Sequence, residues 1–239
     1  MRAGPAGRSL PLRPRRLLRW PGRMLRRGYS QLVDLALGVR TTPAEPHGLL
    51  APIDPDLVST RPCGWLTLLR VFRRLDIRAD DVLLDIGCGA GRAVLLAGLF
   101  GPRRVIGLEA SEPLLAQARR NAGRFRFRRG GSPALVLGDA RSFPTPDEVT
   151  IVLMYNPFTG ETFDAAMKQV YASFERVQRN MTLVYINPIE HEFLVNSGRW
   201  RLVDRIGGPR PTKKSAAPLT THVYRLAGPA EAGGGGTGR

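Results

Sequence analysis

The chain has 239 residues, 43% of them hydrophobic, and a formal net charge of +16, so it is long enough to bury one sizeable core. Its longest apolar runs are far too short to span a membrane, and its three histidines stand apart from any partner at metal-ligand spacing. The two cysteines, Cys63 and Cys88, form no disulfide framework, so we expect a reducing, cytoplasmic compartment.

The N-terminal segment is strongly basic, with ten arginines and a single acid, Asp34, between Met1 and Arg40. Its prolines at positions 5, 11, 14 and 21 interrupt any long helix. Three interpretations remain open: a disordered tail, an arm that contacts a polyanion such as nucleic acid or an anionic surface, and an organellar transit peptide. Arginine outnumbers lysine 33 to 3 along the whole chain, which weakens charge as evidence for function.

Two helical patterns precede the first expected strand. Residues 29–42 are helical in pattern and turn at Gly38, and a proline-rich loop follows over residues 43–55. Apolar residues at helical spacing then predict a helix over residues 65–75 that packs on a sheet.

A glycine-rich turn follows an apolar run in the sequence VLLDIGCGAGR, residues 82–92. This pattern predicts a buried parallel strand, a tight turn whose backbone can approach a ligand, and a helix that begins at Arg92. A strand, a glycine turn and a helix N-terminus together form a nucleotide-type site. The third glycine of the dinucleotide fingerprint would fall on Arg92, so that fingerprint is incomplete.

Polar residues end the next three expected strands. The strand over residues 104–109 closes on Glu109, at a distance from the turn where an acid can hold both hydroxyls of a ribose. In the strand over residues 134–140 the apolar run again ends in a carboxylate, Asp139, whose chemistry also suits a cap on the following turn. The strand over residues 149–154 runs into the sequence YNPF.

The C-terminal part changes pattern after a fifth strand over residues 181–186. This strand runs into a second Asn-Pro pair at Asn187, and His191 follows between two acids, where we expect it to be solvated. Residues 200–206 and 220–226 predict two further strands in a hairpin-like pair.

The spacing Asp85-x-Gly87-x-Gly89-x-Gly91, followed by Glu109 at the next strand end, resembles the first motifs of class I S-adenosylmethionine-dependent methyltransferases. A looser likeness in the N-terminal segment and the Asn-Pro-Phe strand exit extends to bacterial methyltransferase-domain proteins and to Dot1-like protein lysine methyltransferases. The resemblance implies a Rossmann-like α/β fold, with a seven-stranded, mostly parallel sheet, an antiparallel last strand and helices on both faces. It also implies S-adenosylmethionine as the cofactor.

The resemblance further implies which residues form the site. The expected cofactor-binding residues follow the first three strands of the core: Asp85, Gly87, Cys88, Gly89, Gly91, Glu109, Ala110, Asp139 and Ala140. The expected acceptor-side residues follow the fourth strand: Tyr155, Asn156, Pro157 and Phe158. Asn156-Pro157-Phe158 resembles the Asn/Asp-Pro-Pro-aromatic motif of methyltransferases that act on planar amines and amides, but this sequence lacks the second proline of that motif.

These patterns predict a methyltransferase whose acceptor is nitrogen rather than carbon, with protein, small molecule and nucleic acid all open as acceptor classes. The alternative is a protein of this fold that binds without catalysing transfer, for example a nucleic-acid-binding protein that uses the basic arm. We expect four regions: a basic disordered arm (1–30), a helical lid or substrate platform (31–80), the methyltransferase core (81–228) and a glycine-rich flexible tail (229–239). The sequence leaves the oligomeric state open.

Overall fold

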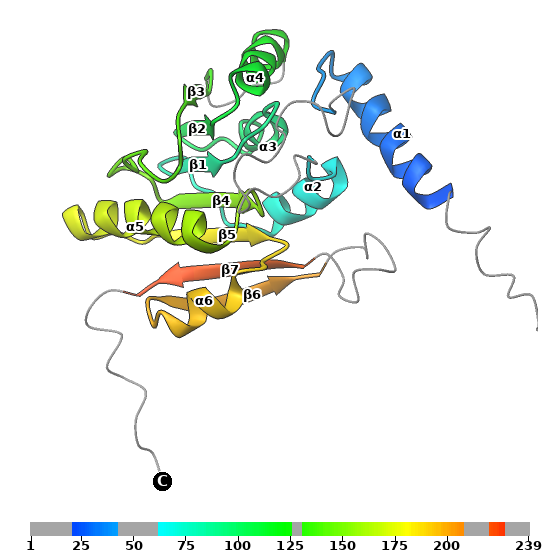
Figure 1. Ribbon diagram of the computed structural model, residues 1–239. Coiled ribbons are helices and arrows are strands. Elements are labelled where there is room, and N and C mark those ends of the chain that lie inside the picture. Colours follow the sequence, from blue (N-terminus) through cyan, green and yellow to red (C-terminus); the bar gives the residue numbers. More distant parts are fainter. Residues whose placement is uncertain (1–20, 43–61, 126–130, 208–219, 228–239) are drawn as a thin grey trace, which may run out of the picture.

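The computed structural model describes residues 21–42, 62–125, 131–207 and 220–227, with only the backbone described over 21–27. These residues form a seven-stranded sheet in the order β3-β2-β1-β4-β5-β7-β6 (Figure 1). The strands are β1 (Val82–Ile86), β2 (Arg104–Glu109), β3 (Ala134–Leu137), β4 (Ile151–Tyr155), β5 (Thr182–Ile186), β6 (Trp200–Ile206) and β7 (Thr221–Leu226). The helices are α1 (Pro21–Ala36), α2 (Trp65–Arg74), α3 (Arg92–Ala97), α4 (Glu112–Arg124), α5 (Gly160–Arg176) and α6 (His191–Asn196).

Only β7 runs against its neighbours, since it pairs antiparallel with both β5 and β6 while the other pairs are parallel. This confirms the expected mostly parallel sheet with an antiparallel last strand. Strand order reverses between β1 and β4, which both pair in the middle of the sheet. In an open α/β sheet, ligands bind beside the carboxyl ends of the strands at such a reversal.

Helices cover both faces of the sheet, as expected. Buried side chains of α2, α3 and the end of α4 form one apolar cluster with one face of the strands. Side chains of α5 and α6 form a second cluster on the other face. All five residues of β1 are buried, because helices cover this central strand on both sides.

The N-terminal helix begins earlier than the sequence pattern indicated. We expected a disordered arm to residue 30, but α1 begins at Pro21, so residues 21–30 are helical and the expected boundary is wrong. The reason is that proline, which interrupts a helix interior, suits the first helical position. The turn expected after this helix is present, since Gly38 has a φ of +69°. Residues 1–20 of the arm, the proline-rich loop and the glycine-rich tail lie outside the described residues.

The C-terminal hairpin-like pair is also present, with an irregularity in register between Leu202 and Asp204 of β6. In the described part of the chain, no helix has the length and apolar character needed to cross a bilayer. Both cysteines, Cys63 and Cys88, are buried and free.

Candidate active site

The glycine turn lies between β1 and α3 at the carboxyl edge of the sheet. Gly87, Gly89 and Gly91 all have positive φ, between +56° and +87°, a region that other residues adopt only with strain. The N–H groups of Gly87 and Cys88 both donate to the carbonyl of Leu108 in β2, at 2.9 Å each. The turn is therefore fastened to the neighbouring strand by its backbone.

The three glycines differ in what surrounds them. A Cβ on Gly87 would lie 2.7 Å from Cβ of Pro157, and one on Gly91 would lie 3.2 Å from Cβ of Ala118 in α4. A Cβ on Gly89 would meet no atom of the described residues within 4 Å. Two glycines therefore permit close packing, and the third leaves open the side of the turn that a ligand can approach.

The carboxylate of Glu109 is buried at the end of β2 and bound to this turn. Its oxygens accept hydrogen bonds from the N–H of Gly89, at 2.8 Å, and from the N–H of Ser111, at 2.9 Å. Burial raises the pKa of Glu109, and these backbone amides oppose that effect. A carboxylate offers about four acceptor positions, so hydroxyl groups of a ligand can still bind. Ser111 occupies the N-cap position of α4, but its side chain makes no capping hydrogen bond.

Asp85, in β1, is the second buried acid of the site. Burial and the nearby charge of Glu109 raise the pKa of Asp85 to about 7. The thiol of Cys88 has a pKa well above its usual value, because it is buried and lies near both carboxylates. Cys88 is therefore a small packing residue of the turn, not a nucleophile.

Asp139 lies after β3 and is half-exposed, unlike the other two acids. Its carboxylate accepts hydrogen bonds from the backbone N–H of Arg141, at 2.9 Å, and from the Arg141 guanidinium, at 2.6 Å. The hydrogen bonds from Arg141 hold the pKa of Asp139 below its usual value. Asp139 therefore caps the turn that follows it, one of the roles that the sequence left open. Ala140 beside it packs against the core.

Asn156 begins the loop after β4 and is 5% exposed, with a φ of +44°. Its side-chain oxygen accepts a hydrogen bond from the hydroxyl of Tyr185, at 3.2 Å. Tyr185 is fully buried in β5 and stacks on Phe163 with ring centroids 5.6 Å apart. The Asn156 carboxamide is therefore held at its oxygen by the hydroxyl of Tyr185.

The other expected acceptor-side residues have different surroundings. Phe158 is buried, with its ring edge toward Phe163 at a centroid distance of 6.5 Å, so it is part of the core. Tyr155 is half-buried and packs against the opposite apolar cluster. Pro157 faces the glycine turn through its contact with Gly87.

Arg92, which occupies the position of the missing third glycine, is buried at the start of α3 and binds the N-terminal segment. Its guanidinium donates to the hydroxyls of Thr41 and Thr42, both at 2.7 Å, and to the carbonyl of Cys63, at 2.8 Å. It also lies over the ring of Trp65, 5.2 Å from the centroid. Burial lowers the pKa of Arg92.

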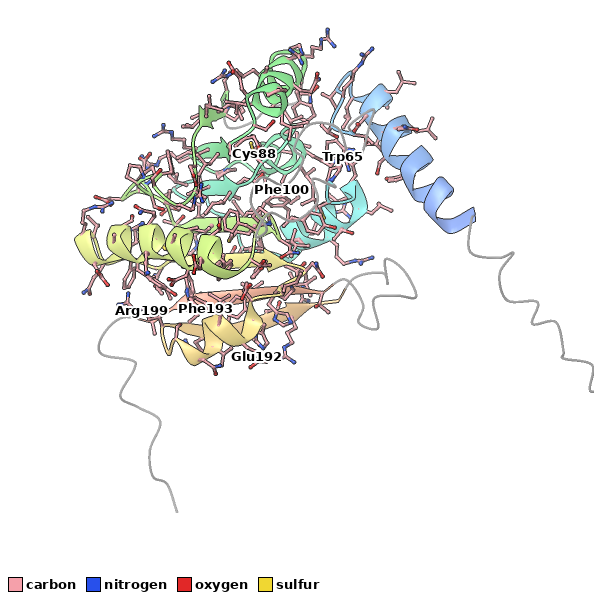
Figure 2. All side chains as sticks on the ribbon, in the orientation of Figure 1. Trp65, Cys88, Phe100, Glu192, Phe193 and Arg199 are labelled. Carbon is pink, nitrogen blue, oxygen red and sulfur yellow. The ribbon has the colours of Figure 1, made fainter. Side chains whose placement is uncertain are left out.

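Asp34, the single acid of the N-terminal segment, completes this network. Its carboxylate accepts from the N–H and hydroxyl of Thr41, at 2.8 and 2.7 Å, from the N–H of Thr42, at 2.9 Å, and from the indole of Trp65, at 2.8 Å. The Arg92 guanidinium lies 3.6 Å from it. Figure 2 shows Trp65 on the side of the core that faces α1. Sequence reasoning missed these residues, although one acid among ten arginines was a usable signal.

Asn121 of α4 makes a further connection from the same segment to the turn. Its side chain accepts from the N–H of Arg40 and donates to the carbonyl of Arg40, both at 2.8 Å. It also donates to the carbonyl of Ala90 in the glycine turn, at 2.8 Å. The N-terminal segment therefore packs directly beside the glycine turn.

His191 is only partly exposed and contacts a tyrosine hydroxyl, whereas we expected it to be solvated. Its Nδ1 lies 2.7 Å from the hydroxyl of Tyr224, and Nδ1 of His222 lies 3.1 Å from the same hydroxyl. Burial, together with the nearby charges of His191 and Arg205, lowers the pKa of His222 to about 4. The antiparallel pairing of β7 brings these distant residues together, which the local sequence could not indicate.

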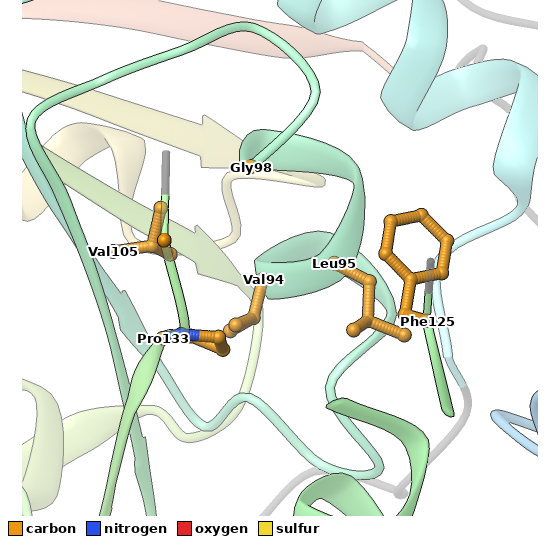
Figure 3. Close-up of a pocket in the computed structure, with 7 residues that line it drawn as sticks. Val94, Leu95, Gly98, Val105, Phe125 and Pro133 are labelled. Atoms are coloured by element: carbon orange, nitrogen blue, oxygen red, sulfur yellow. The ribbon is translucent and has the colours of Figure 1, made fainter. Parts of the chain in front are cut away.

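A small hollow lies near the amino ends of strands β2 and β3, opposite the edge that carries the glycine turn (Figure 3). It is lined by Val94, Leu95, Gly98, Val105, Phe125, Gly131 and Pro133. Val105 and Pro133 lie at the amino ends of β2 and β3, so the hollow is remote from the carboxyl edge where the glycine turn lies. Its apolar lining offers no charged group to a ligand. Within the described residues, no group of three metal-ligating side chains occurs.

Comparisons with known proteins support the same fold. Residues 83–180 match a family model described as a methyltransferase domain. A solved structure from Pyrococcus horikoshii, described as a candidate RNA methyltransferase, is 20% identical, with a TM-score of 0.52, and the match covers 84% of this chain and 98% of the other. No curated protein matches the chain.

Two further structures share the fold at 16% identity and a TM-score of 0.52. One is an S-adenosylmethionine-dependent methyltransferase from Methanosarcina mazei, for which the match covers 63% of this chain and 94% of the other. The other is the magnesium protoporphyrin IX methyltransferase of Synechocystis with bound S-adenosylmethionine, at 68% and 79% coverage. Residues 83–180 therefore match a methyltransferase domain, and the seven-stranded sheet with its glycine turn held by Glu109 has the fold that these methyltransferases share.

Proposed function

We propose that this chain is a methyltransferase that uses S-adenosylmethionine as its cofactor and transfers the methyl group to a nitrogen atom of a planar or protein amine bound at the carboxyl ends of β4 and β5. The contact between Pro157 and Gly87 carries the proposal, because it packs the Asn156 loop against the glycine turn. Methyl transfer is an in-line displacement, so the protein must mainly hold the donor and the acceptor atom close together. A rigid contact between the two loops serves that purpose.

The cofactor side follows from the buried acids and the glycines. Glu109 would bind the ribose hydroxyls with the acceptor positions that its bonds to Gly89 and Ser111 leave free. The open side of Gly89 would accommodate the cofactor backbone. Asp139, with Ala140, would bind the adenine, and Asp139 must share its carboxylate with Arg141 to do so.

Nitrogen is favoured as the acceptor because the groups near Asn156 are poor bases. A neutral amine attacks with its own lone pair, whereas a carbon acceptor first needs proton removal. The Asn156 carboxamide does not take up a proton, and burial raises the pKa of the Tyr185 phenol. His191 and His222 both contact the hydroxyl of Tyr224. The Asn156 oxygen retains one acceptor position beside its bond to Tyr185, which suits an amine N–H.

We also propose that residues 31–80 form a lid or substrate platform. The support is the network of Asp34 and Arg92, which fixes this segment to the first turn of α3, directly after the glycine turn. The fold it shares with the Pyrococcus and Synechocystis proteins does not select among RNA, porphyrin and protein acceptors, because the identities are 20% or lower.

The test is a transfer assay with isotopically labelled S-adenosylmethionine against protein, nucleic acid and small-molecule fractions of a cell extract, followed by chemical analysis of the methylated product. We expect N-methyl products. Asn156→Ala should reduce transfer at least tenfold, while S-adenosylhomocysteine affinity, measured by calorimetry, remains unchanged. Asn180→Ala is the control and should leave transfer unchanged, because Asn180 is exposed at the amino end of β5, away from the carboxyl edge of the sheet. Methyl groups on carbon or oxygen would contradict the nitrogen assignment.

A further inference from the structure

Helix α1 exposes an apolar stripe along its outer face. Tyr29, Leu32 and Leu35 follow one another at three-residue spacing and are 41%, 66% and 78% exposed. Side chains three apart lie on one face of a helix. Other positions of α1, Val33 and Leu37 just beyond its end, pack against the core instead. The helix is therefore apolar toward the protein and also toward solvent.

The sequence of the segment that carries this stripe is strongly basic. Residues 1–40 contain ten arginines, three of them within α1, whereas Asp34 is the single acidic residue of this segment. Asp34 is 5% exposed and its carboxylate is occupied by Thr41, Thr42 and Trp65. No acidic side chain of this segment is thus available to repel an anionic partner.

The position of α1 leaves the stripe accessible. Figure 1 shows α1 at the outside of the molecule, beside α2 and α4 and apart from the sheet. The bonds from Asp34 to Thr41 and Trp65 hold its C-terminal end to the core. The exposed face of Leu32 and Leu35 consequently points away from the body of the enzyme.

We propose that α1 binds to the surface of an anionic lipid bilayer and lies parallel to it. Tyr29, Leu32 and Leu35 enter the interface between headgroups and acyl chains, and the arginines of the same stretch of sequence contact lipid phosphates. A helix with an apolar face, flanking arginines and a tyrosine has the features of an interfacial helix. Because α1 lacks the length and apolar character to cross a bilayer, it remains at the surface.

A bilayer fits these observations better than a nucleic acid does. A phosphate backbone would bind the arginines and leave the leucines in water. A second copy of the chain would bury the leucines and bring two strongly positive segments together, at an electrostatic cost. Only an anionic apolar surface accommodates both the leucines and the positive charge.

The experiment measures sedimentation of the full-length protein with vesicles of phosphatidylcholine alone and of phosphatidylcholine mixed with phosphatidylglycerol. We expect binding to the mixed vesicles that weakens with added salt. The double variant Leu32→Gln and Leu35→Gln should bind at least about tenfold more weakly, because two apolar side chains no longer enter the interface. Glutamine preserves helix propensity, so α1 should still form.

The matched control is the double variant Val177→Gln and Val195→Gln, two side chains that are 47% and 42% exposed elsewhere on the molecule. It should bind vesicles like the unmodified protein. Equal vesicle binding by the leucine variant would overturn the proposal. The proposal also fails if the unmodified protein binds duplex RNA but not the mixed vesicles. It fails as well if the protein is a dimer and the leucine substitutions abolish the dimer without changing lipid binding.

Discussion

Removal of the Asp34 carboxylate should release the N-terminal segment from the core. Asp34→Ala leaves the N–H groups of Thr41 and Thr42 and the Trp65 indole without their acceptor, and it leaves Arg92 buried without its nearest anion. Loss of one partner of a buried ion pair costs about 3–5 kcal/mol. The segment should therefore open far more often, while the sheet stays folded.

Amide hydrogen exchange at Arg40 measures this opening. The N–H of Arg40 donates to Asn121 on α4 and not to Asp34, so its protection reports docking and not the deleted contact itself. A loss of about 3–5 kcal/mol corresponds to exchange that is faster by about two to four orders of magnitude. Nuclear magnetic resonance resolves this amide.

The matched control is Asp204→Ala, which deletes an exposed ion pair with Arg74 at 3.3 Å. Exposed pairs contribute about 0–1 kcal/mol, so exchange at Arg40 should change little. In addition, Arg92→Met together with Asp34→Ala should cost less than the sum of the two single variants, because the pair acts as a unit. If Asp34→Ala changes the Arg40 exchange rate no more than Asp204→Ala does, the network does not hold the segment.

Three further predictions concern the glycine turn and its acids. Gly87→Ala should lower the free energy of unfolding by about 1–3 kcal/mol more than Gly89→Ala, because only at residue 87 does the new Cβ meet Pro157. Both variants share the cost of a positive φ, so the difference in their free energies of unfolding, measured by urea denaturation, isolates the contact with Pro157. Because the pKa of Asp85 rises from 3.8 in the unfolded chain to about 7 in the folded state, the folded state binds more protons between these values. Stability should thus fall by up to about 4 kcal/mol as pH rises from about 4 to about 7, and Asp85→Asn should remove most of that fall in a pH series of unfolding curves. Glu109→Ala should weaken S-adenosylhomocysteine binding at least about tenfold in calorimetry. Asp139→Ala should weaken it less, since Asp139 is half-exposed and paired with Arg141. A larger effect of Asp139→Ala would show that the cofactor does not bind mainly at Glu109.

The core of the fold was predictable because its signals are local. Each parallel strand is a short apolar run that ends in a polar residue, and the backbone needs of the glycine turn are visible as three glycines at fixed spacing. The strand ranges in the structure differ from the expected ones by at most a few residues. The same locality explains why the carboxyl ends of the strands, and with them Glu109 and Asn156, were recognised.

The contacts that the sequence did not predict join distant positions. Arg92 was noticed as the residue that replaces a glycine, but its partners Thr41 and Cys63 lie far away in the chain. His191 finds Tyr224 only through the antiparallel insertion of β7. Proline gave a misleading signal at residue 21, because a helix-breaking residue and a helix-starting residue are the same amino acid in different positions.

The close contact of Gly87 with Pro157 has a consequence for how such an enzyme changes substrate. The proposed donor and acceptor halves of the site meet through the backbone of Gly87 and the ring of Pro157, not through an adaptable side chain. Alignment of the reacting atoms is thus inherited from the sheet itself. Substitutions of the residues around this contact can accommodate new acceptors, whereas Gly87 and Pro157 themselves tolerate almost no substitution.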